Sequence, residues 1–260
     1  MKKHHFKANY HTHCDLCKHA KGNIEDYVKK AIEVGYQKIG FSDHAPFDFL
    51  EERSVRMDKE DYPEYLNQLN HVIKDYSNKI HIYRALEIEY FSDLKAHYQS
   101  LNESLDYLIL GQHYIQVDDQ LKSIYKIKDF NDLIIYKDTV IEAMRSGYFK
   151  IIAHPDIFLM NQFEINDDII KLIDEIILEA KASNVLLEIN ANGFRKSNQK
   201  KKQVWYPRQE FWKRVSQLNA PAIISSDAHD PKHLNDDAMQ KAYQFSRDLS
   251  IAVEEELVLD

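Results

Sequence analysis

The sequence predicts an α/β barrel in which about seven parallel strands alternate with helices. Short, strand-like apolar runs recur along the whole chain, and a helical pattern separates most of these runs from the next. Histidine or carboxylate motifs lie at the carboxyl ends of these runs. Strict alternation favours a parallel sheet covered by helices. Because an open sheet collects ligands mainly where its strand order reverses, a site fed by every strand favours closure into a barrel.

The predicted strands are short segments rich in apolar and β-branched residues. They are Phe6–Tyr10, Lys38–Ser42, Ile80–Tyr90, Tyr107–Gly111, Lys150–Ala153, Val185–Ile189 and Ala222–Ser226. Continuous apolar runs such as Leu108-Ile109-Leu110 are typical of strands buried on both faces.

The predicted helices lie between these strands and repeat apolar residues every three or four positions. They are residues 24–34, 62–76, 128–146, 167–182, 207–218 and 238–249. Asn23 suits an N-cap, and Pro207 suits a first helical turn. The 260 residues show no composition break and no internal repeat, so we expect a single domain spanning residues 1–260.

Composition excludes some classes of function. A net charge of -8 argues against a large nonspecific nucleic-acid surface. No apolar run reaches membrane-spanning length, and no apolar signal-peptide segment follows the basic first residues. Two cysteines are too few for a disulfide scaffold. We therefore expect a cytoplasmic protein with no membrane and no nucleic-acid partner.

The two cysteines form a Cys14-x-x-Cys17 motif. With His11 or His13 they could make a small zinc site, or they could be a redox pair. They could also be two neutral thiols in a loop beside a metal cluster. The last interpretation is favoured, because the other two leave the remaining histidine motifs unexplained.

Side chains that commonly bind metals gather at the predicted strand ends. They are His11, His13, His44, Glu87, His113, His154, Asp227 and His229, and His19 follows six residues after His13. Residues two apart on a strand point to the same side, so His11 and His13 can chelate one ion. Imidazole and carboxylate together suit zinc, iron and manganese, so the pattern predicts a polynuclear metal site. His4 and His5 are expected to be disordered, and His71, His81, His97 and His233 to lie on exposed faces.

The order of the motifs resembles a known family. The motifs are His11-Thr12-His13, Ser42-Asp43-His44, Gly111-Gln112-His113, His154-Pro155-Asp156 and Ser226-Asp227-Ala228-His229. They are similar to those of the PHP (polymerase and histidinol phosphatase) family, especially its stand-alone histidinol-phosphate phosphatases, from about residue 8 to 235. The resemblance implies a distorted (β/α)7 barrel with a trinuclear centre at the carboxyl ends of the strands.

The resemblance also implies roles for individual residues. The nine ligands would be His11, His13, His19, His44, Glu87, His113, His154, Asp227 and His229. Glu87 would bridge two ions, and His19, His44 and His229 would hold the third. In the segment from Glu188 to Arg195, the arginine would meet the substrate phosphate. Apart from the resemblance, Gly193 could allow a tight turn that aims this arginine inward.

Other candidate substrate contacts are weaker. Arg56 and Arg84 could bind phosphate, but a surface ion pair or a helix contact is the more ordinary role for each. The loop from Phe47 to Glu52 could bring aromatic and acidic groups to an imidazole and an ammonium, or it could be an ordinary solvated loop.

The reaction that the resemblance implies is hydrolysis of L-histidinol phosphate to L-histidinol and phosphate, a step of histidine biosynthesis, by direct attack of a metal-bound hydroxide. Three divalent ions, zinc, iron or manganese, would generate the hydroxide and neutralise the phosphoryl oxygens. Asp43, Asp156 and His229 are candidates to protonate the leaving group, and Asp43 and Asp156 could instead orient neighbouring imidazoles. The alternatives are a PHP-type nuclease or phosphodiesterase, and a non-catalytic metal-binding protein. The acidic balance counts against the first, and coordination positions left open for water count against the second.

Overall fold

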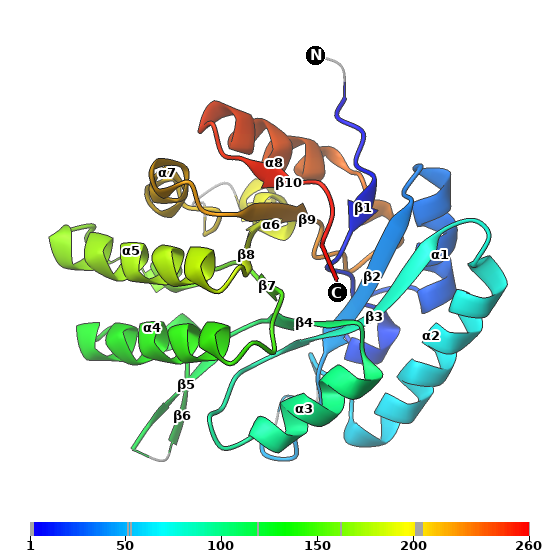
Figure 1. The fold of residues 1–260 in the computed structure, drawn as a ribbon, viewed down its shortest axis with the longest axis horizontal. Helices are drawn as coiled ribbons and strands as arrows, with labels where there is room; N and C mark the ends of the chain where they lie inside the picture. The colour runs from blue at the N-terminus through cyan, green and yellow to red at the C-terminus, as the bar shows by residue number, and fades with distance from the viewer. Residues whose placement is uncertain are drawn as a thin grey trace.

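The protein is a distorted α/β barrel, as the sequence predicted (Figure 1). The computed structural model describes residues 3–50, 52, 54–118, 120–161, 163–200 and 205–259, without the side chains of residues 198–200. Its main sheet has the strand order β1-β2-β3-β4-β7-β8-β9-β10, and every pair is parallel. These strands are β1 (Ala8–Asn9), β2 (Lys38–His44), β3 (His81–Ile88), β4 (Tyr107–Leu110), β7 (Ile151–Ile152), β8 (Leu186–Asn190), β9 (Ala222–Ser225) and β10 (Val253–Glu254). The first seven are the predicted strands.

The helices lie around the outside of the sheet (Figure 1). They are α1 (Ile24–Glu33), α2 (Tyr62–Tyr76), α3 (Lys95–Ser104), α4 (Phe130–Arg145), α5 (Asp167–Ala182), α6 (Ala191–Lys200), α7 (Gln209–Leu218) and α8 (Asp237–Asp248). Asn23 caps α1 as predicted, because its side chain accepts a hydrogen bond from the Asp26 amide. Apolar positions repeat along these helices, and their buried residues pack against the sheet.

Two helices, one hairpin and one short strand were not predicted. Helix α3 buries few residues, among them Tyr98 and Leu101, so its apolar pattern is weak. Helix α6 begins directly after β8, without the turn that usually separates a strand from a helix. The hairpin of β5 (Tyr114–Val117) and β6 (Gln120–Ser123) is antiparallel and lies outside the main sheet. Strand β10 has only two residues.

The barrel closes between its first strand and the segment after β9. Thr12 and Ala228 form a parallel bridge, and the His13 amide donates to the Ala228 carbonyl oxygen at 2.9 Å. Asn9 Oδ1 accepts from the Ser226 amide at 2.6 Å. This closure brings the first and last of the predicted ligand motifs side by side.

The amino end of the barrel is covered by β10 and the residues after it. Val253 and Glu254 pair with the first residues of β9. Beyond them, the Leu257 amide donates to the Tyr10 hydroxyl at 3.0 Å. Leu257 is also part of the apolar cluster that fills the barrel, so this segment seals the interior from below.

The barrel interior is filled by a compact apolar cluster beneath the predicted ligands. Tyr107 spans it and donates from its hydroxyl to the Tyr10 carbonyl oxygen at 2.5 Å. A Cβ at Gly40 would lie 1.8 Å from that hydroxyl, so only glycine fits there. This packed apolar cluster forms the floor beneath the polar site.

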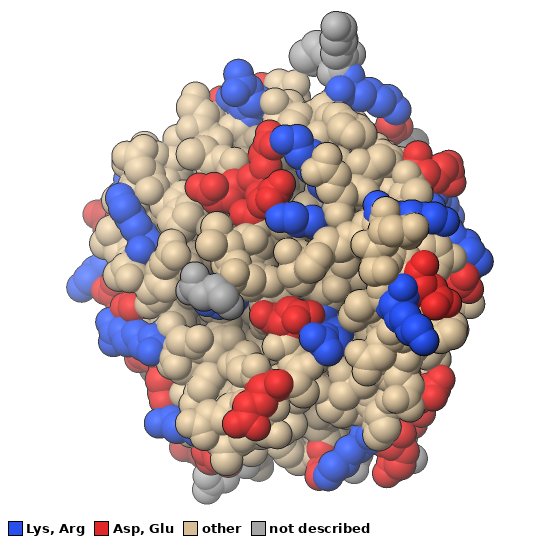
Figure 2. Space-filling view, turned by 45° about the vertical axis from the view of Figure 1, so that its right-hand side comes forward, with Lys and Arg blue, Asp and Glu red and all other residues tan. Residues whose placement is uncertain are grey.

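The surface carries both signs of charge. Basic and acidic side chains are interspersed on the face shown in Figure 2. None of the described helices is both long enough and apolar enough to cross a bilayer.

Candidate metal centre

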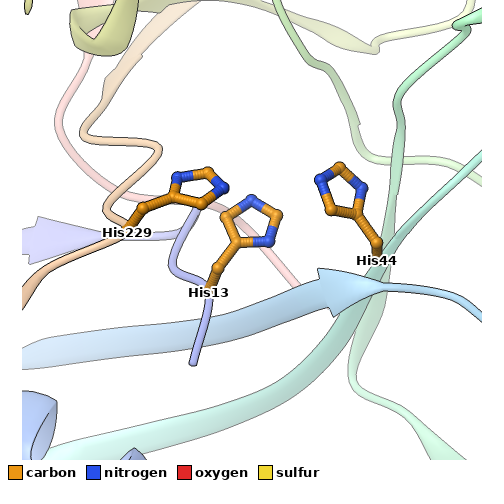
Figure 3. A group of neighbouring side chains, drawn as sticks. All are labelled: His13, His44 and His229. Carbon is orange, nitrogen blue, oxygen red and sulfur yellow. The ribbon is translucent and has the colours of Figure 1, made fainter. Parts of the chain in front are cut away.

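The nine predicted ligands converge at the carboxyl ends of the barrel strands. Seven of them line a cavity of about 490 Å³, and the other two, His11 and His13, are completely buried beneath it. Figure 3 shows how His13, His44 and His229 approach one another from the segments after β1, at the end of β2 and after β9. The side chains divide into three groups. Ligand atoms of His11, His13 and Asp227 lie within 4.8 Å of one another, as do those of Glu87, His113 and His154, while His229 lies equally close to two sets, His13 with His44 and Cys17 with His19.

The deepest group lies between the first and last strands of the barrel. His11 Nε2 and His13 Nε2 are 3.0 Å apart, which agrees with the prediction that they face the same side. Glu87 Oε2 is 3.1 Å from His11 Nε2 and 3.4 Å from His13 Nε2. Asp227 Oδ1 is 3.3 Å from His13 Nε2. Two imidazoles and two carboxylates therefore surround one point, a donor set that suits zinc, iron or manganese.

The second group uses the other oxygen of Glu87. Glu87 Oε1 is 3.2 Å from His154 Nε2 and 3.7 Å from His113 Nε2. This oxygen is buried and accepts no hydrogen bond from any described residue. A buried carboxylate oxygen without a partner is costly, and a cation between it and the two imidazoles would satisfy it. The residues present therefore fit a divalent ion here, with Glu87 between the two groups.

The third group is more open to the cavity. The His19 and His229 ring centroids are 4.4 Å apart, and the His19 and His44 centroids are 5.5 Å apart. His19 Nδ1 is held at 3.0 Å from the Cys17 carbonyl oxygen, which leaves its Nε2 free for a ligand. These are the three imidazoles to which the resemblance assigns a third ion.

Buried acceptors hold several imidazoles by their second nitrogen. His11 Nδ1 lies 2.7 Å from Glu188 Oε1, and His113 Nδ1 lies 3.0 Å from Glu89 Oε1. His13 Nδ1 lies 3.3 Å from Asp43 Oδ1. Such contacts fix the tautomer and the ring orientation, so that the other nitrogen faces the ion.

The electrostatics of the cluster suit metal binding. Burial lowers the pKa of His19 to about 4, and it lowers the pKa of His44 and of His229, so these rings are neutral, as ligands must be. Burial opposes ionisation of Glu87 and Asp227, but neighbouring histidines overcome it and hold the pKa of each carboxyl well below its ordinary value.

His11 behaves differently. Burial acts to lower its pKa, but Glu188, Glu87 and Asp227 outweigh that effect and raise it to about 10. The carboxylates thus make the base of the site strongly negative, and a divalent cation bound there would balance this charge.

Gly111 makes room for Glu87. A Cβ at this position would lie 2.3 Å from Glu87 Oε1 and 2.5 Å from Glu87 Cγ. Any larger residue would push the carboxylate out of the centre of the cluster, so the glycine of the Gly111-Gln112-His113 motif has a steric role.

Both cysteines are free and fully buried. Cys14 Sγ donates to Asp43 Oδ2 at 2.7 Å. Burial raises the pKa of the Cys14 thiol and of the Cys17 thiol. These features fit the interpretation of two neutral thiols beside the cluster.

Asp43 and Asp156, two of the candidate proton donors, do not line the cavity. Asp43 is occupied by His13 and Cys14, so it orients the imidazole. The Asp156 carboxylate accepts from the Arg208 amide and from Trp212 Nε1 at 3.1 Å, and burial raises its pKa to about 7. Of the three candidates, His229 alone faces the cavity.

Arg84 is not brought to the site. Arg84 lies three positions before Glu87 on β3, so its side chain points to the opposite, outer face, where its guanidinium binds Asp106. Arg84 therefore forms an ion pair, the more ordinary of its two predicted roles. Arg56 lines the cavity, but its guanidinium is held by Glu89 at 2.7 Å and by Glu52 at 3.0 Å.

Arg195 also lines the cavity, and its guanidinium is similarly occupied. Its Nε is 2.7 Å from Asp236 Oδ2, and its Nη atoms donate to Ser226 and to the His233 carbonyl oxygen. The predicted tight turn at Gly193 is wrong, because Gly193 lies within α6. A Cβ there would lie 2.1 Å from the Tyr206 carbonyl oxygen, so the glycine permits close packing.

The sequence did not indicate several residues of the site. The Tyr125 and Tyr206 rings line the cavity beside His113 and His154, with ring centroids 6.2 Å and 5.6 Å apart. Glu89 could have been found, because it lies two residues after Glu87 along the chain. Neither tyrosine stands at the end of a predicted strand, so neither carries such a signal.

Three expectations for other histidines are resolved by the structure. His71, His81 and His97 are exposed, as expected. His233 is only partly exposed and lines the cavity, so its predicted exposed position is wrong. His4 was expected to be disordered, but its ring stacks on Tyr243 at a centroid distance of 3.8 Å. In the loop from Phe47 to Glu52, Glu51 lies outside the described residues, and Glu52 does line the cavity.

Comparison with known proteins identifies the family. The family model described as "PHP domain" matches residues 9–192, which include all the predicted ligands except Asp227 and His229. The chain belongs to the PHP domain family. The motif resemblance is thereby confirmed over most of the sequence.

Individual relatives extend the match beyond residue 192. A protein of Deinococcus radiodurans named "Probable histidinol-phosphatase" is 26% identical over 231 residues, covering 85% of each chain. A Schizosaccharomyces pombe protein of the same name is 26% identical over 251 residues, covering 85% of this chain and 80% of its own. The histidinol phosphate phosphatase of Lactococcus lactis, solved with zinc, L-histidinol and phosphate, superposes with a TM-score of 0.71 at 18% identity and 95% coverage of both chains. The last match supports the barrel fold.

Proposed function

We propose that this PHP protein is a metal-dependent phosphatase that hydrolyses L-histidinol phosphate to L-histidinol and phosphate. The observation that carries the proposal is the convergence of seven histidines and two carboxylates on one cavity at the carboxyl ends of the strands. The named PHP relatives and the ligands of the Lactococcus lactis enzyme support the choice of substrate.

Each group of side chains has a proposed task in binding ions. His11, His13, Glu87 and Asp227 would hold the first ion, and Glu87, His113 and His154 the second. His19, His44 and His229 would hold the third. When bound, the ions supply an activated water and neutralise the phosphoryl oxygens. The chain's own contribution is to fix the ligands through Glu188, Asp43 and Glu89.

The cavity walls suit the organic part of this substrate. Tyr125 and Tyr206 offer aromatic rings to a planar imidazole. Glu52 lies at the cavity with its side chain 27% exposed, and it can pair with an ammonium. Arg56 and the Tyr114 hydroxyl both bind Glu52, so the carboxylate is held in one place. We propose Glu52 as the contact for the substrate amino group.

We propose that the leaving oxygen is protonated by a group that lines the cavity. His229 is the one of the three candidates that lines the cavity, and its Nδ1 is fixed 3.1 Å from the Asp227 carbonyl oxygen. As a proposed ligand of the third ion, His229 is less available for proton transfer.

A substrate screen tests the proposal. Metal-loaded protein is assayed against L-histidinol phosphate, other small phosphomonoesters, phosphodiesters and short DNA strands under one set of conditions. We expect the highest kcat/KM for L-histidinol phosphate. Faster hydrolysis of DNA or of a diester would overturn the assignment and favour the nuclease alternative. A protein that binds metal and hydrolyses none of these esters would favour the non-catalytic alternative.

A further inference from the structure

The cavity is lined by three basic side chains, Arg56, Arg195 and Lys196. The two arginines are already neutralised. Arg56 pairs with Glu52 and Glu89, and Arg195 pairs with Asp236. A phosphate could bind either arginine only in competition with a carboxylate that already lies at hydrogen-bonding distance from the guanidinium. The third side chain, Lys196, is in a different situation.

Lys196 presents its ammonium at the cavity without a competing carboxylate. It follows Arg195 in α6, and its Nζ donates to the Tyr206 hydroxyl at 3.3 Å. The same Nζ lies 5.8 Å from the Tyr206 ring centroid. Among the described residues, Lys196 forms no ion pair.

Tyr206 connects this ammonium to the metal centre. The Tyr206 ring is buried, and its centroid lies 5.6 Å from that of His154, a proposed ligand of the second ion. Because the buried phenol cannot move freely, it holds the flexible lysine over one side of the cavity. An ammonium has three donors, so two remain for a ligand after the bond to Tyr206.

We propose that Lys196, positioned by Tyr206, is the phosphate-binding cation of this site outside the metal ions. This inference rests on the proposed phosphatase function, and it transfers the predicted phosphate contact from Arg195 to its neighbour. A phosphomonoester dianion has oxygens that the ions do not hold, and Lys196 can donate to them. Such a charge-assisted contact corresponds to about a 10- to 100-fold change in binding or in kcat/KM.

The test compares Lys196→Met with Lys196→Arg and with a control, Lys171→Met. Methionine keeps much of the apolar stem and removes the charge. Lys171 is exposed on α5 and does not line the cavity. The first probe is inorganic phosphate, whose binding to the metal-loaded proteins is measured by calorimetry. Metal content is measured on each protein, and affinities are compared per metal-loaded molecule.

We expect Lys196→Met to weaken phosphate binding about 10- to 100-fold, while Lys196→Arg recovers most of it and Lys171→Met changes nothing. Tyr206→Phe should give a smaller loss in the same direction, because the charge remains but its position is less fixed. Phosphate binding by Lys196→Met equal to that of the unmodified protein would overturn the inference, as would an equal loss in the Lys171→Met control.

The calorimetric arm is independent of the substrate assignment. If L-histidinol phosphate is not hydrolysed but Lys196→Met still loses phosphate affinity, the proposed substrate fails and the role of Lys196 stands. If the ester is hydrolysed and Lys196→Met keeps both its phosphate affinity and its kcat/KM, the role of Lys196 fails and the proposed function stands.

Discussion

Replacing Arg195 tests whether this buried guanidinium supports the metal site or binds substrate. Its side chain is 8% exposed, and that of its partner Asp236 is 25% exposed. Arg195→Ala would leave the carbonyl oxygens of Ser226 and His233 without this donor. Asp236 would keep its hydrogen bonds from the amides of Ala238 and Met239.

We expect Arg195→Ala to lower the free energy of unfolding by about 3 kcal/mol. This is the low end for a broken buried ion pair, because Asp236 stays partly solvated and keeps other hydrogen bonds. For a domain of this size, the loss should lower Tm by about 6–12 °C. Ser226 precedes Asp227, and His233 follows His229, so Arg195 ties both ends of the segment that carries these two ligands. We therefore expect Arg195→Ala to lose metal as well as stability.

The assay measures thermal unfolding and elemental metal content for Arg195→Ala, Arg195→Lys and Lys196→Met. Arg195→Lys should recover only part of the stability, because an ammonium lacks the planar fork that reaches Asp236 and Ser226 together. Lys196→Met should keep the Tm and metal content of the unmodified protein. Full metal content and an unchanged Tm in Arg195→Ala, together with a large loss of kcat/KM, would refute this reasoning and return Arg195 to direct phosphate binding.

Three further predictions concern the metal centre. Glu87→Gln should lose much more metal than His71→Gln, because Glu87 lies between two ligand groups and His71 is exposed on α2. Equal losses of metal by elemental analysis would contradict the proposed bridge. Chelation should abolish phosphatase activity and lower Tm, since ions that bind only the folded chain stabilise it, and activity that persists after verified metal removal would exclude the mechanism. Gly111→Ala should reduce metal content, because its Cβ would lie only 2.3 Å from Glu87 Oε1 and displace the carboxylate. Retention of all bound metal would show that the carboxylate can be accommodated elsewhere.

The sequence was sufficient to predict the barrel because its strands are buried on both faces and alternate regularly with amphipathic helices. The close approach of His11, His13 and Glu87 also followed from strand periodicity and from the parallel alignment of strand ends. These features depend on local pattern and on a few general rules of sheet geometry.

The environment of each charged side chain could not be predicted in the same way. Arg195 and Lys196 are neighbours in the sequence, yet one is bound by Asp236 and the other donates to Tyr206. Asp156 follows a ligand motif closely, but its carboxylate turns toward Trp212. Such pairings join segments far apart in the chain, and a single sequence carries no local signal for them.

The closure of the barrel has a consequence for the order of events during synthesis. Asn9 and Ser226, which join the first strand to the segment after β9, are 217 residues apart in sequence. His11 and His13 emerge early from the ribosome, but the carboxylate and imidazole of Asp227 and His229 become available only after nearly all of the barrel has been made. A nascent chain therefore exposes an incomplete set of the proposed ligands until the segment after β9 has been made. Binding of metal by all of these ligands must await that segment, so it follows the translation of nearly all of the barrel.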